Sequence, residues 1–308
     1  MIHKEFPDLQ WLKKQAEDGF TNRQVLHGLT PPVYGWPTVI LNVKSKNIFR
    51  DHIRGPLSIF TNISGSSSVQ CGNKKTTIRE GFFFVTNHDQ HYTLEISKQA
   101  PAETFNVHLG EYWADHALRT MISRPEQLID EAFFTIPFQR LELHNKLCYR
   151  DTIVNTIIHD LRNSDGDTLK QEENLCDLLV HLLREDRQVR KAEGKIPSLK
   201  SATRQEIMKR LLIATDYIHS FYDKDLTLDE LAGVACLSKF HFLRLFKIAF
   251  GKTPHKFINE VKVEQSKLLL RNPGIEVYTI ARSLGFQDAS TFSRMFYNQT
   301  GVYPSQYR

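Results

Sequence analysis

The stretch LDELAGVACLSKFHFLRLFKIAFGKTP, residues 228–254, is followed by a second version of itself, VYTIARSLGFQDASTFSRMFYNQTGVYP, residues 277–304. The two align with an offset of 49 residues before the central turn and 50 after it, because Gln287 is an extra residue in the second turn. The matched positions are Leu231-Ala232 with Ile280-Ala281, Phe242 with Phe292, Arg244 with Arg294, Phe246 with Phe296, Gly251 with Gly301, and Pro254 with Pro304. A repeat this dense indicates two copies of one supersecondary unit.

The first copy has the pattern of two helices joined by a tight turn. Thr227 followed by Glu230 is a capping box that predicts the start of a short helix. The turn falls at Cys236-Leu237, and Ser238 is the expected cap of the next helix, which ends at Gly251. The apolar residues at helical spacing are Leu228, Leu231, Ala232, Ala235, Phe242, Leu245, Phe246 and Ala249. Each copy is therefore predicted to be a helix-turn-helix, with Gly285-Phe286 as the second turn and Asp288 as its cap.

The second helix of each copy keeps a face that the apolar spacing does not use. In the first copy this face carries Lys239, Phe240, Leu243, Arg244 and Lys247; in the second it carries Ala289, Ser290, Thr291, Ser293, Arg294 and Tyr297. Cations beside apolar groups suit a helix in the DNA major groove, where phosphates attract charge and thymine methyls accept apolar contact. A solvated surface arginine is the alternative for either Arg alone. Because Arg244 and Arg294 share one register, we expect each to read a guanine.

Residues 205–308 resemble the AraC/XylS family of bacterial transcription regulators. The residues that carry the resemblance are Leu231-Ala232, Ser238, Phe242 to Lys247, Gly251, Pro254, Ile280-Ala281, Gly285-Phe286, Asp288, Phe292-Ser293-Arg294, Phe296, Gly301, Pro304 and Tyr307-Arg308. Lys262 stands where an Arg is common in the family, and Ser266 where an Ala is common. The resemblance implies a domain that binds double-stranded DNA, acts through RNA polymerase, and usually activates transcription.

Length and composition allow two domains. The chain has 308 residues, of which 41% are hydrophobic, as in globular proteins with a sizeable core. We expect an α+β protein with a cupin-like β-barrel and flanking helices in residues 1–186, a charged linker at 187–204, and an all-α DNA-binding domain at 205–308. The N-terminus has no signal-peptide pattern, no apolar run is long enough for a membrane, and the four cysteines match no C-x-x-C metal spacing. These features favour a cytoplasmic protein with reduced thiols.

The net charge of +5 lies entirely in the repeat region. Residues 204–308 contain 15 Lys/Arg and 10 Asp/Glu, whereas the rest of the chain contains 25 of each. Excess positive charge in one domain is the electrostatic footprint expected of DNA binding. Between the two copies, residues 254–271 are predicted to form one helix of about 27 Å. It would hold the two reading helices somewhat less than one DNA turn, roughly 34 Å, apart.

The sequence pattern of the N-terminal part changes along its length. Residues 1–30 are expected to be helical or irregular, residues 38–110 contain short β-rich runs broken by turn residues about every ten positions, and residues 111–186 have helical periodicity. The run from Arg79 to Glu95 resembles the barrel of the cupin-like sensor domains that precede many regulators of this family. The helices either pair two protomers into a homodimer or only pack on the barrel, and the sequence does not decide between these.

A small-molecule effector of unknown identity is the partner that such a barrel implies. The candidate residues for its pocket are Phe82, Phe84, His91, Tyr92 and His108, with ordinary barrel core as the alternative for these side chains. His88, His91, Glu95 and His108 raise the question of a metal. Because the cupin His-x-His arrangement is absent, and two residues between His88 and His91 direct them to opposite faces of a strand, we expect no metal and no cofactor.

An enzymatic function is the main rival reading. A cupin-type metalloenzyme with a C-terminal helical interaction module would need three or four metal ligands, which the sequence does not assemble by spacing. A DNA-repair methyltransferase would need an activated cysteine near metal-binding cysteines. No nucleophile elbow, Walker loop or dinucleotide fingerprint occurs. We therefore assign no catalytic residue and expect a regulator rather than an enzyme.

Overall fold

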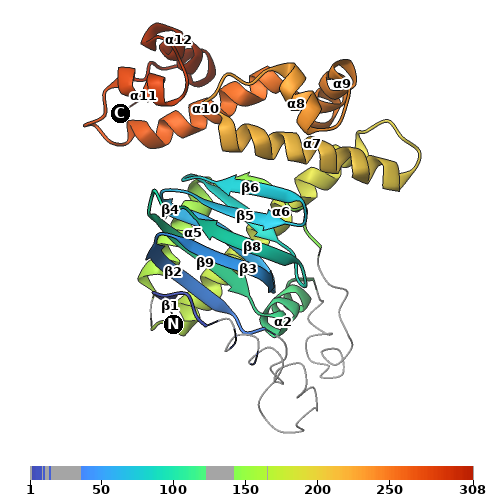
Figure 1. The fold of residues 1–308 in the computed structure, drawn as a ribbon, viewed down its shortest axis with the longest axis vertical. Coiled ribbons are helices and arrows are strands. Elements are labelled where there is room, and N and C mark those ends of the chain that lie inside the picture. Colours follow the sequence, from blue (N-terminus) through green and yellow to red (C-terminus); the bar gives the residue numbers. More distant parts are fainter. Residues whose placement is uncertain are drawn as a thin grey trace. The chain divides into compact units, whose positions relative to one another are not determined.

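The computed structural model describes residues 2–8, 10, 14, 36–122, 142–164 and 166–307. Two compact units, residues 1–186 and 187–308, divide the chain (Figure 1). The strands are β1 (Ile2–His3), β2 (Val39–Ser45), β3 (Ile48–Arg54), β4 (Leu57–Ser64), β5 (Ser67–Cys71), β6 (Lys74–Ile78), β7 (Phe82–Thr86), β8 (His91–Ile96), β9 (Ala102–Leu109) and β10 (Leu147–Tyr149). The helices are α2 (Glu111–Ile122), α5 (Thr152–Asn163), α6 (Thr168–Gly194), α7 (Ser201–Phe221), α8 (Leu228–Val234), α9 (Lys239–Phe250), α10 (Pro254–Leu270), α11 (Val277–Ser283) and α12 (Ala289–Thr300).

The strands of the N-terminal unit form two facing sheets. One has the order β1-β2-β9-β4-β7-β10 and the other β3-β8-β5-β6. Neighbouring strands are antiparallel except for β1 and β2, which pair in parallel through Ile2 with Ile40 and His3 with Leu41. The β-rich runs in residues 38–110 therefore predicted β2 and β4 to β9 but not β3 (Ile48–Arg54), and the two-domain α+β architecture is confirmed.

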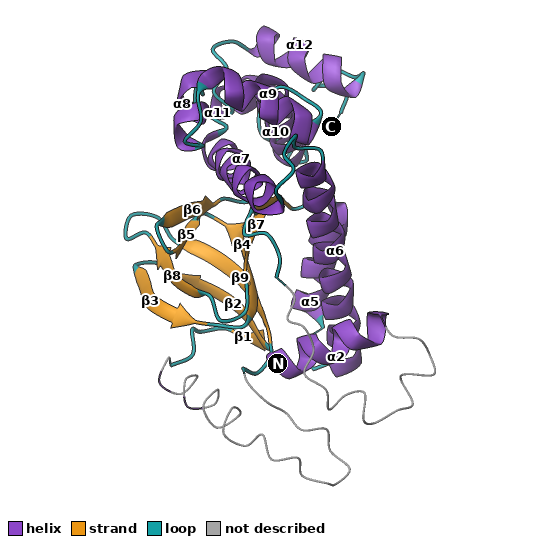
Figure 2. Cartoon of the chain, turned by 90° about the vertical axis from the view of Figure 1, so that its right-hand side faces the viewer, coloured by secondary structure: helices purple, strands orange, loops and turns teal. Residues whose placement is uncertain are grey.

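The larger sheet is buried on both faces. Alternate residues of its central strands, such as Phe83, Phe105 and Val107, pack in a cluster with α2, α5 and α6, which cover one face (Figure 2). The intervening residues point towards the second sheet, because successive side chains of a strand face opposite ways. Every residue of β7 is buried for this reason, so its FFFVT run lacks the polar alternation of a half-exposed strand.

Three expectations about element boundaries are wrong. Ile2–His3 and Leu147–Tyr149 are edge strands, although the first lay in an expected irregular lead-in and the second among expected helices. Strands this short carry no periodicity, and only pairing with β2 and β7 defines them. The expected linker 187–204 is mostly helical, since α6 continues to Gly194 and α7 begins at Ser201. Much of the lead-in, residues 123–141 of the expected helical part, and Arg308 lie outside the described residues.

The C-terminal unit is all-helical and holds the two helix-turn-helix copies as α8-α9 and α11-α12. The helix between them is α10, as predicted, with Arg271 as its C-terminal cap. Ile280, Ala281, Phe292 and Phe296 are buried in one cluster with Val263 of α10. Within the described residues, no helix is long and apolar enough to cross a membrane.

Candidate nucleic-acid interface and effector pocket

Local hydrogen bonds fix the first helix-turn-helix. The Thr227 hydroxyl accepts a hydrogen bond from the Glu230 backbone N–H at 3.2 Å, which confirms half of the predicted capping box. The Glu230 carboxylate does not complete the box; it accepts a hydrogen bond from the Tyr217 hydroxyl of α7 at 2.6 Å. Ser238 is the N-cap residue of α9, as predicted, but its side chain makes no capping hydrogen bond. Thus α8 is tied to α7 as well as capped.

The outer face of α9 is exposed as the spacing predicted. Lys239, Phe240, Arg244 and Lys247 are exposed and Leu243 is half-buried, while Phe242, Leu245, Phe246 and Ala249 are buried. Phe240 is 84% exposed, so its ring is available for contact with a partner. Lys239 forms an ion pair with Asp229 at 2.7 Å. Among the described residues, Arg244 and Lys247 form no ion pair and are free to contact phosphates or bases.

The second copy is capped more completely than the first. Asp288 accepts hydrogen bonds from the Thr291 backbone N–H at 2.7 Å and from its hydroxyl at 2.8 Å. These bonds hold the pKa of Asp288 below its usual range. The Thr291 hydroxyl is thereby engaged with its own helix cap. Gly301 ends α12 in the left-handed conformation, as Gly251 ends α9.

The outer face of α12 is smaller and more polar than that of α9. Ser290, Thr291 and Arg294 are exposed, Ser293 is half-buried, and Ala289 packs against the core of the unit. Of the six expected outer residues, Ala289 is therefore the least available to a partner. Arg294 is exposed without an ion pair within the described part of the chain, as Arg244 is.

Sequence reasoning missed part of this surface. A groove between α10 and α12 is lined by Asn259, Thr291, Arg294, Met295, Asn298 and Gln299. Asn298 lies one turn beyond Arg294, so the i, i+4 spacing could have identified it. Asn259 comes from another helix, and only the packing of α10 against α12 brings it near Arg294. On α9, the exposed His241 was also missed.

The helix α10 separates the two reading helices. It has 17 residues, so it is about 25 Å long. Lys262 is buried against the Phe286 ring, with its Nζ 4.7 Å from the ring centroid. Burial lowers the pKa of Lys262, and the carboxylates of Asp225 and Asp223 act against that shift. Lys262 therefore anchors the second turn to α10.

Comparison with known proteins agrees with this arrangement. Residues 231–308 match the family model of a helix-turn-helix domain. An uncharacterized HTH-type transcriptional regulator of Haemophilus influenzae is 27% identical over 259 residues, covering 79% of this chain and 83% of that protein. The regulator MtrA of Neisseria gonorrhoeae is 35% identical over 81 residues, 26% of this chain and 27% of MtrA. A solved AraC-type regulator from Chromobacterium violaceum is 21% identical with a TM-score of 0.31, covering 35% of this chain and 94% of that one.

Residues 231–308 thus belong to a helix-turn-helix domain family, and most of the chain is similar to an HTH-type transcriptional regulator. The C-terminal unit is accordingly a DNA-binding domain.

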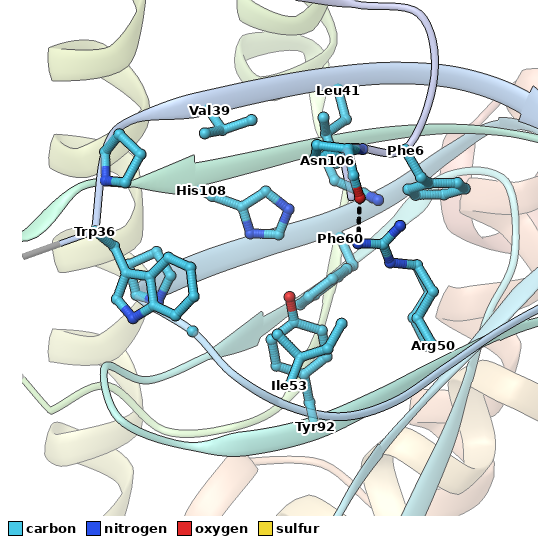
Figure 3. Close-up of a pocket in the computed structure, with 15 residues that line it drawn as sticks. Phe6, Trp36, Val39, Leu41, Arg50, Ile53, Phe60, Tyr92, Asn106 and His108 are labelled. Atoms are coloured by element: carbon cyan, nitrogen blue, oxygen red, sulfur yellow. Dashed lines mark hydrogen bonds between the residues drawn. The ribbon is translucent and has the colours of Figure 1, made fainter. Parts of the chain in front are cut away.

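The N-terminal unit of the regulator contains a pocket between its two sheets (Figure 3). The cavity measures about 40 Å³, enough for roughly three waters or a slender ligand group. Its lining residues are Phe6, Pro7, Trp36, Pro37, Val39, Leu41, Arg50, Ile53, Gly55, Pro56, Phe60, Tyr92, Leu94, Asn106 and His108. Aromatic and aliphatic walls with a few polar groups are typical of a small-molecule site.

The polar groups of the pocket are held in defined states by burial. Burial, together with the positive charge of Arg50, lowers the pKa of His108 to about 4. The His108 ring is therefore neutral near pH 7, and its Nδ1 lies 2.9 Å from the Ser58 hydroxyl. Burial raises the pKa of Tyr92 well above its usual range, so Tyr92 keeps its phenolic proton.

Arg50 is the cationic group of the pocket. Burial lowers its pKa, while Tyr92 and Asp8 act in the opposite direction. Its guanidinium donates a hydrogen bond to the Pro7 carbonyl at 2.8 Å and lies 5.1 Å from the centroid of the Phe6 ring. Figure 3 shows this hydrogen bond as a dashed line from the guanidinium. The pocket thus combines an apolar body with one charged donor.

The structure separates the five residues expected to line an effector pocket. Tyr92 and His108 line it, whereas Phe82, Phe84 and His91 do not. Phe82 and Phe84 are core side chains of β7, and His91 is exposed and stacks on His52 with ring centroids 4.5 Å apart. No sequence pattern identified Arg50 or Trp36, because the fold brings these residues to the pocket from separate parts of the chain.

The three histidines and Glu95, which were considered as metal ligands, do not lie together in the structure. Glu95 forms an ion pair with Lys75, His91 is exposed, and His108 faces the pocket. His88 alone has ligand-type neighbours, which are Asp89 and Glu111. Glu111 was missed because it lies 23 residues along the chain, at the first turn of α2.

Proposed function

We propose that the regulator reads two successive major grooves with α9 and α12, in response to a small molecule bound by its N-terminal unit. The observation that carries the reading assignment is the matched pair Arg244 and Arg294. Both are exposed, both lie one turn into the second helix of a helix-turn-helix, and neither is engaged in an ion pair within the described residues. A free guanidinium in this position can form two hydrogen bonds to the O6 and N7 atoms of guanine.

The two helices would contribute differently to recognition. The α9 face combines Arg244 and Lys247 with the exposed ring of Phe240, which suits both phosphates and thymine methyls. The α12 face offers Ser290 and Arg294, with fewer groups that can discriminate between bases. We therefore assign most of the sequence discrimination to α9 and a supporting role to α12.

Substitution of the two arginines tests this assignment. Arg244→Ala and Arg294→Ala should each weaken binding by about 1–3 kcal/mol and relax the preference at one base pair in its own half of the site. Lys247→Ala is the matched comparison, because a phosphate contact should weaken all sequences evenly and lower the salt slope by about 1. Binding would be measured by gel shift on a library randomised at each position. An even loss across all sequences for an Arg variant would make that Arg a phosphate contact.

The effector is assigned from the chemistry of the pocket. Its apolar walls and the Arg50 guanidinium fit a slender, largely apolar molecule with one hydrogen-bond acceptor or anionic group for Arg50. Activation of transcription through RNA polymerase, and pairing of two protomers, belong to this proposal on the family resemblance.

A metabolite screen by thermal shift, with tryptophan fluorescence as a second readout, tests the effector assignment because Trp36 lines the pocket. Arg50→Gln should abolish the shift produced by any hit. Arg54→Gln is the control, since Arg54 lies on the same strand but pairs with Asp89. A hit that is equally strong on Arg50→Gln binds elsewhere.

A further inference from the structure

One group of metal-ligand side chains lies beside the pocket and takes no part in the proposed function. The ligand atoms of His88, Asp89 and Glu111 all lie within 4.8 Å of one another. His88 Nε2 is 2.7 Å from Glu111 Oε1 and 3.3 Å from Asp89 Oδ2. The side chains are 12%, 27% and 8% exposed, respectively, so the group is largely removed from solvent.

These spacings match those of a metal's ligands. Nitrogen and oxygen ligands bind Zn²⁺ at about 2.0–2.2 Å, so neighbouring ligand atoms stand roughly 3.0–3.5 Å apart in tetrahedral or octahedral geometry. The two separations from His88 Nε2, 2.7 Å and 3.3 Å, differ from this range by at most a few tenths of an ångström. An imidazole with two carboxylates suits a first-row divalent cation better than Mg²⁺ or Ca²⁺, which prefer oxygen ligands alone.

The surroundings leave the required atoms in place. Arg54 binds Asp89 through Oδ1 at 2.8 Å, while Oδ2 is the oxygen nearest His88. A ligating carboxylate commonly accepts a hydrogen bond on its other oxygen, which orients it. The two carboxylates also give the group the negative charge that a divalent cation neutralises.

The group joins two segments that support the pocket. Asp89 N–H donates to the Gly55 carbonyl at 3.0 Å, and Glu111 N–H donates to the Trp36 carbonyl at 3.2 Å. Gly55 and Trp36 both line the pocket. A cation bound here would fasten the turn after β7 to the first turn of α2, and so fix the backbone of one pocket wall.

We propose that His88, Asp89 and Glu111 bind one first-row divalent cation, with Zn²⁺ as the preferred ion, and that the ion stabilises the N-terminal unit. This site is separate from DNA reading and from the effector pocket. The alternative is that the three side chains form only an ion-paired cluster.

Titration of the chelator-treated full-length chain with ZnCl₂ and MnCl₂ distinguishes the two. Calorimetry should find one Zn²⁺ equivalent that is lost in His88→Gln and in Glu111→Gln. The matched controls are His91→Gln and Glu95→Gln, which change neighbouring residues of the same types outside the group. Both control variants should still bind one Zn²⁺ equivalent. At a hundredfold excess over Kd, Zn²⁺ should raise the Tm of the N-terminal unit by about 5–10 °C in the wild type and both controls.

Two further measurements keep the test decisive if the variants fold poorly. Asp89→Asn changes a partly exposed turn residue and should lower Zn²⁺ affinity at least tenfold without unfolding the chain, as judged by circular dichroism. Co²⁺ added to the folded wild type should give a visible absorption band that Zn²⁺ abolishes. A Zn²⁺ equivalent retained in Glu111→Gln, or a wild type that shows no such equivalent, would overturn the proposal in favour of the ion-paired cluster.

Discussion

Gly285, in the turn of the second helix-turn-helix, and Gly301, at the end of its second helix, differ in their surroundings. Both have a positive φ, 80° and 77° respectively, a conformation that costs other residues roughly 1–2 kcal/mol. A Cβ on Gly285 would collide with the Asp223 carbonyl oxygen, whereas a Cβ on Gly301 would meet open space. Position 285 thus requires glycine for both its backbone conformation and its packing, whereas position 301 favours glycine for its backbone conformation alone.

Alanine at these two positions should therefore have unequal effects. We expect Gly301→Ala to lower the free energy of unfolding of the C-terminal unit by about 1 kcal/mol, and Gly285→Ala by at least about 3 kcal/mol because the turn must also move away from Asp223. Circular dichroism at 222 nm under urea measures both. Equal losses of unfolding free energy in the two variants would show that the turn can move away from Asp223 without a further free-energy cost.

His108 makes the stability of the N-terminal unit depend on pH. Its pKa of about 4 in the folded chain lies below the unfolded value of 6.5, so between these values the unfolded chain binds the extra proton. Stability is then fully present above pH 6.5 and is lost as pH falls towards 4, by up to about 3 kcal/mol. His108→Gln should remove this part of the acid sensitivity. The three tryptophans all lie in residues 1–186, so their fluorescence reports this unit. An unchanged pH profile in the variant would assign the sensitivity to other groups.

The helix α10 sets the spacing of the DNA site. At about 25 Å it can place α9 and α12 on one face of the duplex, in boxes whose centres are about 10 bp apart. Inserting about 5 bp between the boxes turns the second one to the far side, beyond the reach of Arg294. Binding should fall to what one motif supports, and a full-turn insert should not rescue it. Footprinting on this series measures the effect, and undiminished binding to the half-turn insert would mean that only one motif reads DNA.

The division of the chain into two units predicts that DNA binding is self-contained. All of the excess positive charge and both helix-turn-helix motifs lie in residues 187–308. This fragment should bind the operator with the same base preferences as the whole chain, and its affinity should fall steeply with salt as counterions are released from phosphates. Gel shifts at several salt concentrations compare the two proteins. A folded fragment without base preference would show that the N-terminal unit is needed for reading.

The sequence alone determined the parts of this protein that depend on local spacing. The repeat fixes both helix-turn-helix motifs, because helix periodicity, caps and terminal glycines act over a few residues. The exposed faces of α9 and α12 follow from the same periodicity. The alternation of β-rich runs with turns likewise determined the strands between Val39 and Leu109, except β3 (Ile48–Arg54).

Only the tertiary structure decided the features built from residues far apart in the chain. The pocket takes Arg50, Tyr92 and His108 from three strands. Phe84 faces the same side of its sheet as its pairing partner Phe60, but it lies outside the pocket because β7 is beyond β4, away from β2 and β9. The edge strands β1 and β10 exist because a neighbour pairs with them. Glu111 joins His88 and Asp89 because α2 begins beside the turn after β7. Spacing along a chain specifies faces of single elements, whereas strand pairing and packing decide which faces meet.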